Sequence, residues 1–269
     1  GEGRFAGIPS VFLRTFGCNF TCDGFGMPKG EKSAERFNII PTAYDDYLDL
    51  PLVHTGCDSY ASHDVRFKHL SPMYKVEDLA IKLLDTIPFK NWGSSNNDVH
   101  LIITGGEPLL GWQRSYPELL RQPAMKEVRN ITFETNGTQD LQQELIDFFN
   151  NERPDIHVTF SVSAKLSSSG ELWEEAIRPD IVLNYRAINN SFIYLKFVVS
   201  HYDDVVDVER AIVEYDAYAN NIPVYIMPAG GTDQLYFQNT RWVADLALSR
   251  GWRYSPRLQV DIWKNAWYT

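Results

Sequence analysis

Apolar segments rich in β-forming residues alternate with segments of helical period along most of the chain, and this alternation limits the possible folds more than any other feature. Seven apolar runs cover residues 10–16, 98–104, 130–135, 157–163, 192–199, 223–228 and 257–263. Most are nearly continuous in apolar residues, as buried parallel strands are. Segments with helical period lie between them, over residues 76–87, 140–149, 204–219 and 240–250. The sequence therefore predicts an α/β fold with a parallel sheet, either open or curled into a barrel.

One stretch interrupts this alternation. Residues 23–56 are polar, contain three Pro and four Gly, and lack a convincing strand. We interpret them as an insertion in the loop that follows the first strand. The chain of 269 residues suits one sizeable domain, so residues 1–269 are expected to form a single domain that carries this insertion.

The charge balance and the cysteine count exclude several classes of protein. Asp and Glu number 35 against 25 for Lys and Arg, so the net charge of −10 opposes binding to nucleic acid or to an anionic membrane. No apolar run approaches the roughly 18 to 20 residues of a membrane span, and we expect no basic and apolar leader before the first motif. Only three cysteines occur, unlike the paired framework of a secreted disulfide-rich domain. We expect a soluble cytoplasmic protein without a nucleic-acid or membrane partner.

Short polar motifs follow five of the predicted strands. They are "TFGCNFTC", "TGGEP", "ETNGT", "VSAK" and "MPAGGT". Each alone could be an ordinary turn. Because α/β folds place their chemistry at the carboxyl ends of their strands, five such motifs at equivalent positions predict one shared site.

The cysteines suggest what that site holds. Cys18 and Cys22 have three residues between them, and a 4Fe-4S cluster with one open iron commonly takes three thiolates spaced CxxxCxxC. Phe25 occupies the third position, but Cys57 follows directly after the insertion, in "CDSY". The entropy of closing a loop grows only with the logarithm of its length, so an insertion can separate two ligands. Three buried, reduced thiols without a metal are the alternative.

Several stretches in the same order resemble a known family. These are "GEGRFAGIPSVFLRTFGCN", "CDSY", "TGGEPLL", "ETNGT", "VSAK", "LKFVV", "MPAGGT" and "SPRLQ". Because it contains these stretches in this order, the chain resembles radical S-adenosylmethionine (SAM) enzymes, and among them the 7-carboxy-7-deazaguanine synthases. It departs from their pattern in the insertion before Cys57 and in Ala164, where "SPK" is usual. The resemblance implies a partial (β/α) barrel of the radical SAM type, with a long insertion in the cluster loop.

The resemblance also implies a reaction and its cofactors. A 4Fe-4S cluster on Cys18, Cys22 and Cys57 would donate one electron to SAM and produce a 5′-deoxyadenosyl radical. The substrate would be 6-carboxy-5,6,7,8-tetrahydropterin, converted to 7-carboxy-7-deazaguanine with loss of ammonia, in 7-deazaguanine (queuosine-type) biosynthesis. SAM would be re-formed, and Mg²⁺ would assist the ring contraction. A flavodoxin-type or ferredoxin-type electron donor and a homodimer are expected, although the aromatic tail, residues 255–269, could instead close the barrel.

Roles in SAM binding follow from the same resemblance. They fall to Gly105, Gly106, Glu107, Ser163, Lys165 and Met227. The glycines would permit close backbone approach to the ligand, and Glu107 would receive the SAM ammonium. Ser163 and Lys165 would reach the ribose and carboxylate, and Met227 would line the adenine pocket. Glu107 could instead be a helix N-terminal carboxylate, Lys165 a solvated charge, and Met227 core filler.

Roles in substrate and magnesium binding complete the predicted site. Glu134 and Asn136, with Glu2 as a further candidate, would contact the pterin edge, and Arg14 would hold the substrate carboxylate in its planar fork. An Arg within an apolar run is costly to bury unless an anion neutralises it. The substrate carboxylate or a structural Glu could be that anion. Ser59, two residues after Cys57, would be an oxygen ligand of Mg²⁺.

Two other functions share some of these features. A glycyl-radical enzyme activase uses the same cluster chemistry on a protein backbone, but has little need for "ETNGT" or "SPRLQ". A non-catalytic iron-sulfur or zinc module would leave "TGGEP" and "VSAK" without purpose. His54, His63 and His69 surround the cluster loop, but their spacing matches no familiar zinc pattern, so we interpret them as loop residues.

Overall fold

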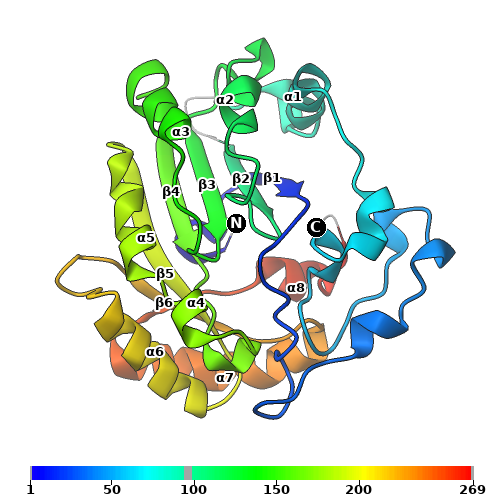
Figure 1. Ribbon diagram of the computed structural model, residues 1–269, viewed down its shortest axis with the longest axis vertical. Coiled ribbons are helices and arrows are strands. Elements are labelled where there is room, and N and C mark those ends of the chain that lie inside the picture. Colours follow the sequence, from blue (N-terminus) through cyan, green and yellow to red (C-terminus); the bar gives the residue numbers. More distant parts are fainter. Residues whose placement is uncertain (1, 94–98, 268–269) are drawn as a thin grey trace.

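A curved parallel sheet forms the centre of the computed structural model, which describes residues 2–93 and 99–267. Within these residues the sheet has seven strands, paired in the order in which they occur in the chain. They are β1 (Ser10–Thr15), β2 (His100–Gly105), β3 (Asn130–Thr135), β4 (His157–Val162), β5 (Ser191–Val199), β6 (Val224–Pro228) and β7 (Arg253–Tyr254). Every neighbouring pair is parallel. In the described chain β7 does not pair with β1, so the sheet is open, which is consistent with a partial barrel (Figure 1). The parallel strands with helices between them confirm the predicted α/β fold.

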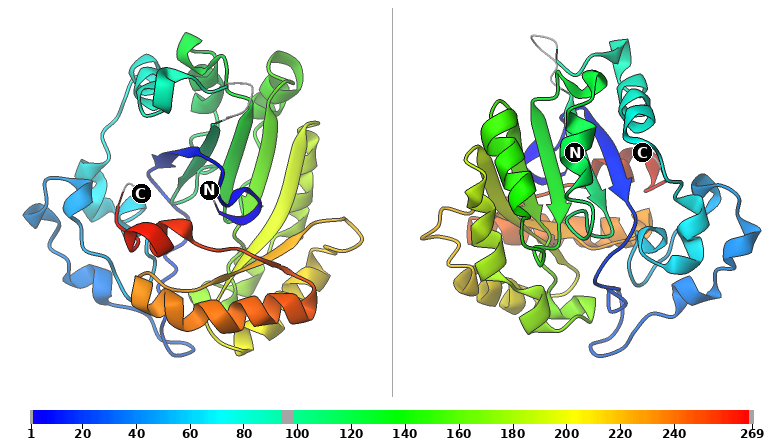
Figure 2. Two further views of the ribbon diagram at one scale, coloured as in Figure 1. Left: turned by 180° about the vertical axis from the view of Figure 1, so that it is seen from behind. Right: turned by 45° about the horizontal axis from the view of Figure 1, so that its top comes forward.

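Helices cover the outer face of this sheet, as the views from two sides show (Figures 1 and 2). In the described part of the chain the α-helices are α1 (Val76–Asp85), α2 (Ser115–Leu120), α3 (Gln143–Asp147), α4 (Trp173–Ala176), α5 (Pro179–Asn184), α6 (Asp203–Glu214), α7 (Asp233–Arg250) and α8 (Leu258–Trp263). A π-helical turn, Phe148–Glu152, continues α3. None of the described helices has the length and apolar character needed to cross a membrane.

The main hydrophobic core lies between the sheet and these helices. All six residues of β2 are buried, and β4 to β6 are buried along nearly all their length. Phe133 on β3 and Phe160 on β4 are register partners whose rings stack 5.6 Å apart, and Tyr185 stacks on Phe160 at 4.4 Å. At the edge of the sheet β1 is only half-buried, because it has one neighbour.

The predicted strand over residues 257–263 is wrong. Leu258–Trp263 form α8, and the seventh strand is the dipeptide Arg253–Tyr254 just before it. Leu258, Val260 and Ile262 alternate as in a strand, and a short apolar run cannot be assigned by pattern alone. Val260 alone among the three is fully buried, and Ile262 is exposed, so no sheet partner covers this segment.

The other boundaries differ less. Asp98, at the start of one predicted strand, lies outside the described residues, and β2 begins at His100. The predicted helix over residues 140–149 is α3 with its π-helical continuation, whereas α7 begins earlier than its pattern indicated. The short helices α2, α4 and α5 were not predicted.

The insertion, residues 23–56, contains three 3-10 turns and no strand, as expected. Its apolar residues join those that follow Cys57 in a second cluster, which we call the satellite core: Leu50, Val53, Tyr60, Ala61 and Phe67. The indole of Trp267 packs against this cluster and donates a hydrogen bond to the Leu50 carbonyl (2.7 Å). The C-terminal segment thus lies beside the insertion on the open side of the barrel (Figure 2).

Candidate functional site

The carboxyl ends of the strands surround one large cavity of about 1650 Å³. A pocket for one small ligand measures about 300–1,000 Å³, so this volume has room for two. Its walls include these predicted site residues: Glu2, Arg14, Cys18, Cys22, Cys57, Ser59, Gly105, Gly106, Glu134, Asn136, Ser163, Lys165 and Met227. Of the residues predicted from the sequence, only Glu107 lies outside the cavity wall.

The three cysteines meet at one end of this cavity. Cys22 is buried with Phe20 and Ala176, and Cys18 and Cys57 pack against the same apolar group. Burial raises the pKa of all three thiols, to about 12 for Cys57, and nearby negative charge adds to this effect: Glu107 for Cys18, Cys57 for Cys22 and Asp58 for Cys57. Such thiols stay protonated unless cations hold them as thiolates. Three convergent free thiols are therefore a donor set that fits an iron-sulfur cluster.

A mononuclear metal ion has different requirements. Within residues 2–93 and 99–267, no group of three or more His, Cys, Asp or Glu side chains is arranged to hold a metal ion. A single zinc ion draws its sulfur ligands to about 2.3 Å from one centre. A cluster instead binds each thiolate to a different iron, so its ligands lie further apart. His54 is exposed and pairs with Glu35.

The two glycines of "TGGEP" are required by the protein itself. Gly105 has a φ of +146°, and a Cβ there would lie 2.1 Å from the Thr15 carbonyl oxygen. A Cβ on Gly106 would lie 2.3 Å from the Gly17 carbonyl oxygen and 2.7 Å from the Cys18 Cβ. The end of β2 can thus press against the start of the cluster loop only without side chains. Their contact with SAM stays a prediction.

Glu107 is fully buried and bonded within the protein. Its carboxylate accepts hydrogen bonds from the Leu109 and Asn136 backbone N–H groups (3.0 and 2.6 Å) and from the Thr135 hydroxyl (2.7 Å). Burial raises its pKa despite these donors. The side chain of Asn136 is also engaged, since its amide nitrogen donates to Asn19 in the cluster loop (2.9 Å). Both residues join the ends of β2 and β3, and their contacts with ligands stay predictions.

The residues after β4 face the cavity as predicted from their position. Lys165 Nζ donates to the carbonyl and the hydroxyl of Ser163 (2.9 and 3.2 Å). Its positive charge lowers the pKa of the nearby cysteine thiols, although burial outweighs it. Met227, on β6, is buried in the cavity wall. Neither residue shows by itself which ligand it would meet.

Acidic and basic side chains alternate across the cavity in a set that we call the charge chain. Its members are Glu134, Lys196, Glu2, Arg257 and Asp58. Lys196 Nζ lies 2.6 Å from Glu2 and 3.7 Å from Glu134. Arg257 lies 3.6 Å from Glu2 and 2.8 Å from Asp58, the residue after Cys57. The charge chain thus joins β3, β5 and both terminal segments to the cluster loop.

The pKa values within the charge chain follow from its burial and pairing. Burial alone would raise the pKa of Glu2, but Lys196 and Arg257 lower it to about 2. Burial alone would lower the pKa of Lys196, but Glu2 and Glu134 raise it well above its usual value. Glu2 also accepts a hydrogen bond from Gln259 (2.7 Å). Both of its oxygens are therefore used inside the protein, and direct contact with the pterin stays a prediction.

Arg14 contacts neutral oxygens only. One guanidinium nitrogen donates to the Ser59 hydroxyl and to the Gly105 carbonyl, both at 3.3 Å. Within the described residues no carboxylate forms an ion pair with it, and its side chain faces the cavity from the edge strand. The expected partner is thus not a structural Glu of the described chain. An unpaired cation at a cavity wall suits an anionic ligand.

Comparison with curated proteins gives these features a context. The chain is 28% identical to 7-carboxy-7-deazaguanine synthase of Halobacterium salinarum over 99% of its own length and 87% of that protein. The synthase of Pyrobaculum aerophilum is 32% identical over 62% of this chain and 66% of its own. The synthase of Rhodopirellula baltica is 25% identical over 98% of this chain and 83% of its own. The chain resembles the 7-carboxy-7-deazaguanine synthases over nearly its whole length. No family model and no solved structure matches it.

Two members of the charge chain lie in motifs that resemble the synthases but were not predicted as site residues. Lys196 stands in "LKFVV" and Arg257 in "SPRLQ", yet neither was assigned a role. A Lys inside a nearly continuous apolar run is as costly to bury as an Arg, so the argument applied to Arg14 would have found Lys196. Arg257 gave no such signal, because its buried position depends on α8 turning back toward the cluster loop.

Proposed function

We propose that the chain is a radical SAM synthase that converts 6-carboxy-5,6,7,8-tetrahydropterin to 7-carboxy-7-deazaguanine with loss of ammonia, in 7-deazaguanine (queuosine-type) biosynthesis. The observation that carries the proposal is the convergence of Cys18, Cys22 and Cys57 on the cavity that also contains the charge chain. Similarity to the synthases over 99% of the chain supports the choice of reaction.

The cofactors of this proposal are a 4Fe-4S cluster, SAM and Mg²⁺. The three cysteines would hold the cluster, which when bound supplies the electron that cleaves SAM. Lys165 and Ser163 face the same cavity beside the thiols and would bind the carboxylate and ribose of SAM. Met227 would pack against the adenine. Gly105 and Gly106 keep the cavity wall free of side chains.

The pterin would lie between Arg14 and the charge chain. Glu134 would accept paired N–H donors of the pterin edge, and Lys196 would hold this carboxylate in place from behind (3.7 Å). Arg14, without an anionic partner in the described chain, would bind the substrate carboxylate. Glu2 and Asn136 would act mainly by fixing the walls of the pterin site.

Binding of Mg²⁺ at Ser59 would require an anion that interacts with both the metal ion and Arg14. The Arg14 guanidinium lies 3.3 Å from the Ser59 hydroxyl, so it would repel a bare cation there. A substrate carboxylate placed between Arg14 and Mg²⁺ removes that repulsion, because it is attractive to both. Binding of metal and substrate would therefore support each other.

The partners beyond the substrate complete the proposal. A flavodoxin-type or ferredoxin-type protein would supply the electron, and two copies of the chain would form a homodimer. No contact within the described residues favours the glycyl-radical activase, whereas the charge chain suits a small charged substrate.

Anaerobic reconstitution tests the proposal directly. Protein incubated with iron, sulfide, dithionite, SAM, Mg²⁺ and the pterin should form 7-carboxy-7-deazaguanine, detected by mass spectrometry, and release ammonia without consuming SAM. Cys57→Ala and Cys18→Ala should lose the brown chromophore to the same extent. A Cys57→Ala protein with a full cluster, or turnover that occurs only with a protein substrate, would contradict the assignment.

A further inference from the structure

The backbone of Cys22 adopts a conformation that only a few residues tolerate. Its φ is +51°, in the left-handed region, which is strained for a residue with a Cβ. The residue is also buried. Such strain persists only where surrounding contacts determine the conformation, and two groups beside the cluster loop provide such contacts.

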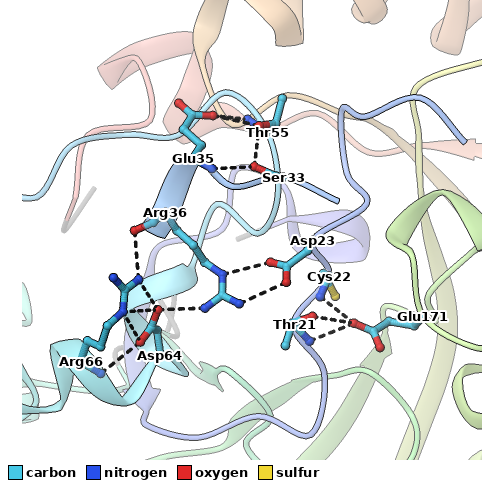
Figure 3. A network of polar contacts seen from close by, with 10 residues as sticks. All are labelled: Thr21, Cys22, Asp23, Ser33, Glu35, Arg36, Thr55, Asp64, Arg66 and Glu171. Carbon is cyan, nitrogen blue, oxygen red and sulfur yellow. Dashed lines mark hydrogen bonds and ion pairs between the residues drawn. The ribbon is translucent and has the colours of Figure 1, made fainter. Parts of the chain in front are cut away.

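Glu171 is the first of these groups. One of its carboxylate oxygens accepts hydrogen bonds from the backbone N–H groups of Cys22 (2.6 Å) and Thr21 (2.9 Å) (Figure 3). Both contacts are short, so they account for the position of this carboxylate beside a buried thiol.

Backbone contacts next to Glu171 strengthen this arrangement. The Gly24 N–H donates to the Ser169 carbonyl (2.8 Å), and a Cβ on Gly24 would lie 2.6 Å from the Gly170 nitrogen. The segment before α4 is thus pressed against the chain on both sides of Cys22. No side chain larger than hydrogen fits at residue 24.

Arg36, inside the insertion, is the second group. Two of its nitrogens bind both oxygens of Asp23, the residue after Cys22, at 3.0 and 3.1 Å. A third nitrogen binds Asp64 at 2.8 Å, and Asp64 is also held by Arg66 (Figure 3). The Arg36 and Asp23 side chains are 11% exposed and that of Asp64 is 5% exposed, so water screens these ion pairs little.

The insertion returns to its starting point at this position. The Gly56 N–H donates to the Phe25 carbonyl (2.7 Å), and the Ser33 N–H donates to the Asp23 carbonyl (2.7 Å). Cys57 therefore follows directly after a contact with Phe25, the position where the common spacing places the third thiol. Arg36 thus ties the insertion to Asp23, next to Cys22, and to Asp64, which follows Cys57 in the chain.

We propose that Glu171 and Arg36 are positioning residues of the cluster loop. Glu171 holds the Cys22 backbone in its left-handed conformation, and Arg36 holds the insertion closed so that Cys57 stays beside Cys22. This inference rests on the proposed function, because it assumes that the three thiols bind one cluster. Neither residue lines the cavity.

Iron retention tests the proposal separately from turnover. Glu171→Ala and Arg36→Met should release iron to a chelator about tenfold faster than the loaded wild type, because each loses charge-assisted hydrogen bonds. Glu171→Gln and Arg36→Lys keep part of the hydrogen bonding, so their release should be only about threefold faster. The matched controls are Glu174→Ala, an exposed residue of α4, and Arg121→Met, which breaks an exposed pair with Glu152.

The outcomes separate positioning from simple stability. The proposal requires faster iron release and a smaller rise in melting temperature on cluster loading than in the controls. A lower melting temperature of the cluster-free protein with unchanged iron release would overturn it. If the Ala or Met variant does not fold, the Gln and Lys variants decide, and wild-type release from both would overturn it. A wild type that binds no cluster would refute the proposed function as well.

Discussion

Lys196 shows how one buried charge organises the site at the scale of a residue. Its side chain is 4% exposed, and its ammonium group lies between Glu2 of the N-terminal segment and Glu134 of β3. Removing one partner of a buried ion pair leaves an uncompensated charge, and this costs more than the pair contributes. Lys196 therefore fixes the position of Glu134, the carboxylate that we assign to the pterin edge.

Glu134→Gln should lower kcat/KM for the pterin about tenfold to a hundredfold, since a hydrogen bond to a charged group contributes roughly 1.5–3 kcal/mol. A Gln amide offers one acceptor oxygen where the carboxylate offers two. Iron content and SAM binding should stay as in the wild type. Steady-state kinetics with the exposed variant Glu118→Gln as control make the comparison, and unchanged pterin kinetics would remove Glu134 from the substrate site.

Ser59→Ala should raise the half-saturating Mg²⁺ concentration about tenfold, the scale observed when a metal-site partner is lost. Ser59→Thr should be nearly neutral, because it keeps the hydroxyl oxygen. The hydroxyl also donates to Asp58 (3.2 Å), so a purely structural role would lower the melting temperature of the Ala variant without changing its Mg²⁺ dependence. Activity measured across a Mg²⁺ titration separates the two roles.

At the scale of elements, the C-terminal segment completes two different parts of the molecule. Arg257, just before α8, belongs to the charge chain, whereas Trp267 covers the satellite core. The Trp267 ring packs edge-on against Tyr47 of the insertion at 4.7 Å and against Tyr60 at 6.0 Å. One short segment thus fastens both the substrate side and the insertion side of the cavity.

Trp267→Ala should destabilise the protein by about 2–3 kcal/mol, less than for a fully buried Trp, because its ring is only half-buried. The insertion should become the first site of limited proteolysis, since its apolar residues lose their cover. Trp263→Ala is the matched control, because that side chain is 52% exposed. Equal losses in urea unfolding for both variants would show that the satellite core does not depend on Trp267.

The sequence predicted the sheet well because six strands are long and apolar, and such runs need no distant partner to be recognised. The strand predicted over residues 257–263 was wrong. There the ion pair between Arg257 and Asp58 and the packing of Trp267 on the satellite core decide the conformation. The cysteines, Arg14 and Glu134 were found from motif order, yet Arg36 and Glu171 were not. Only the folded chain brings Arg36 to Asp23 and the segment before α4, with Glu171, to Cys22. The single-domain expectation stays a prediction.

At the scale of the whole molecule, the open sheet is held together by charge as well as by its core. β7 does not pair with β1 in the described chain, and the two terminal segments meet instead through Glu2, Arg257 and Gln259. Gly3 permits this contact, since a Cβ there would lie 2.5 Å from the Tyr194 hydroxyl. The open side of the barrel therefore depends on an ionised Glu2.

Lowering the pH should weaken the contact between the two terminal segments over a defined pH range. The pKa of Glu2 is about 2 in the folded protein against 4.5 for a free side chain, so its contribution is complete above pH 4.5 and is lost as the pH falls toward 2. The contribution is on the order of 2–3 kcal/mol. Urea midpoints of cluster-free wild type should fall more steeply over this range than those of Glu2→Gln. Exposed Glu31→Gln is the control, and parallel curves for wild type and Glu2→Gln would contradict the assignment.

The hydrogen bond between the Gly56 N–H and the Phe25 carbonyl affects how freely the length of the insertion can change in evolution. Because the insertion leaves and re-enters at one point, its length can grow or shrink without moving the thiols that flank it. Its composition is less free, since Tyr60 and Phe67 need apolar cover from Leu50 and Val53. A segment of another length can thus replace the insertion, provided that it supplies apolar side chains to cover Tyr60 and Phe67 and a cation in the place of Arg36.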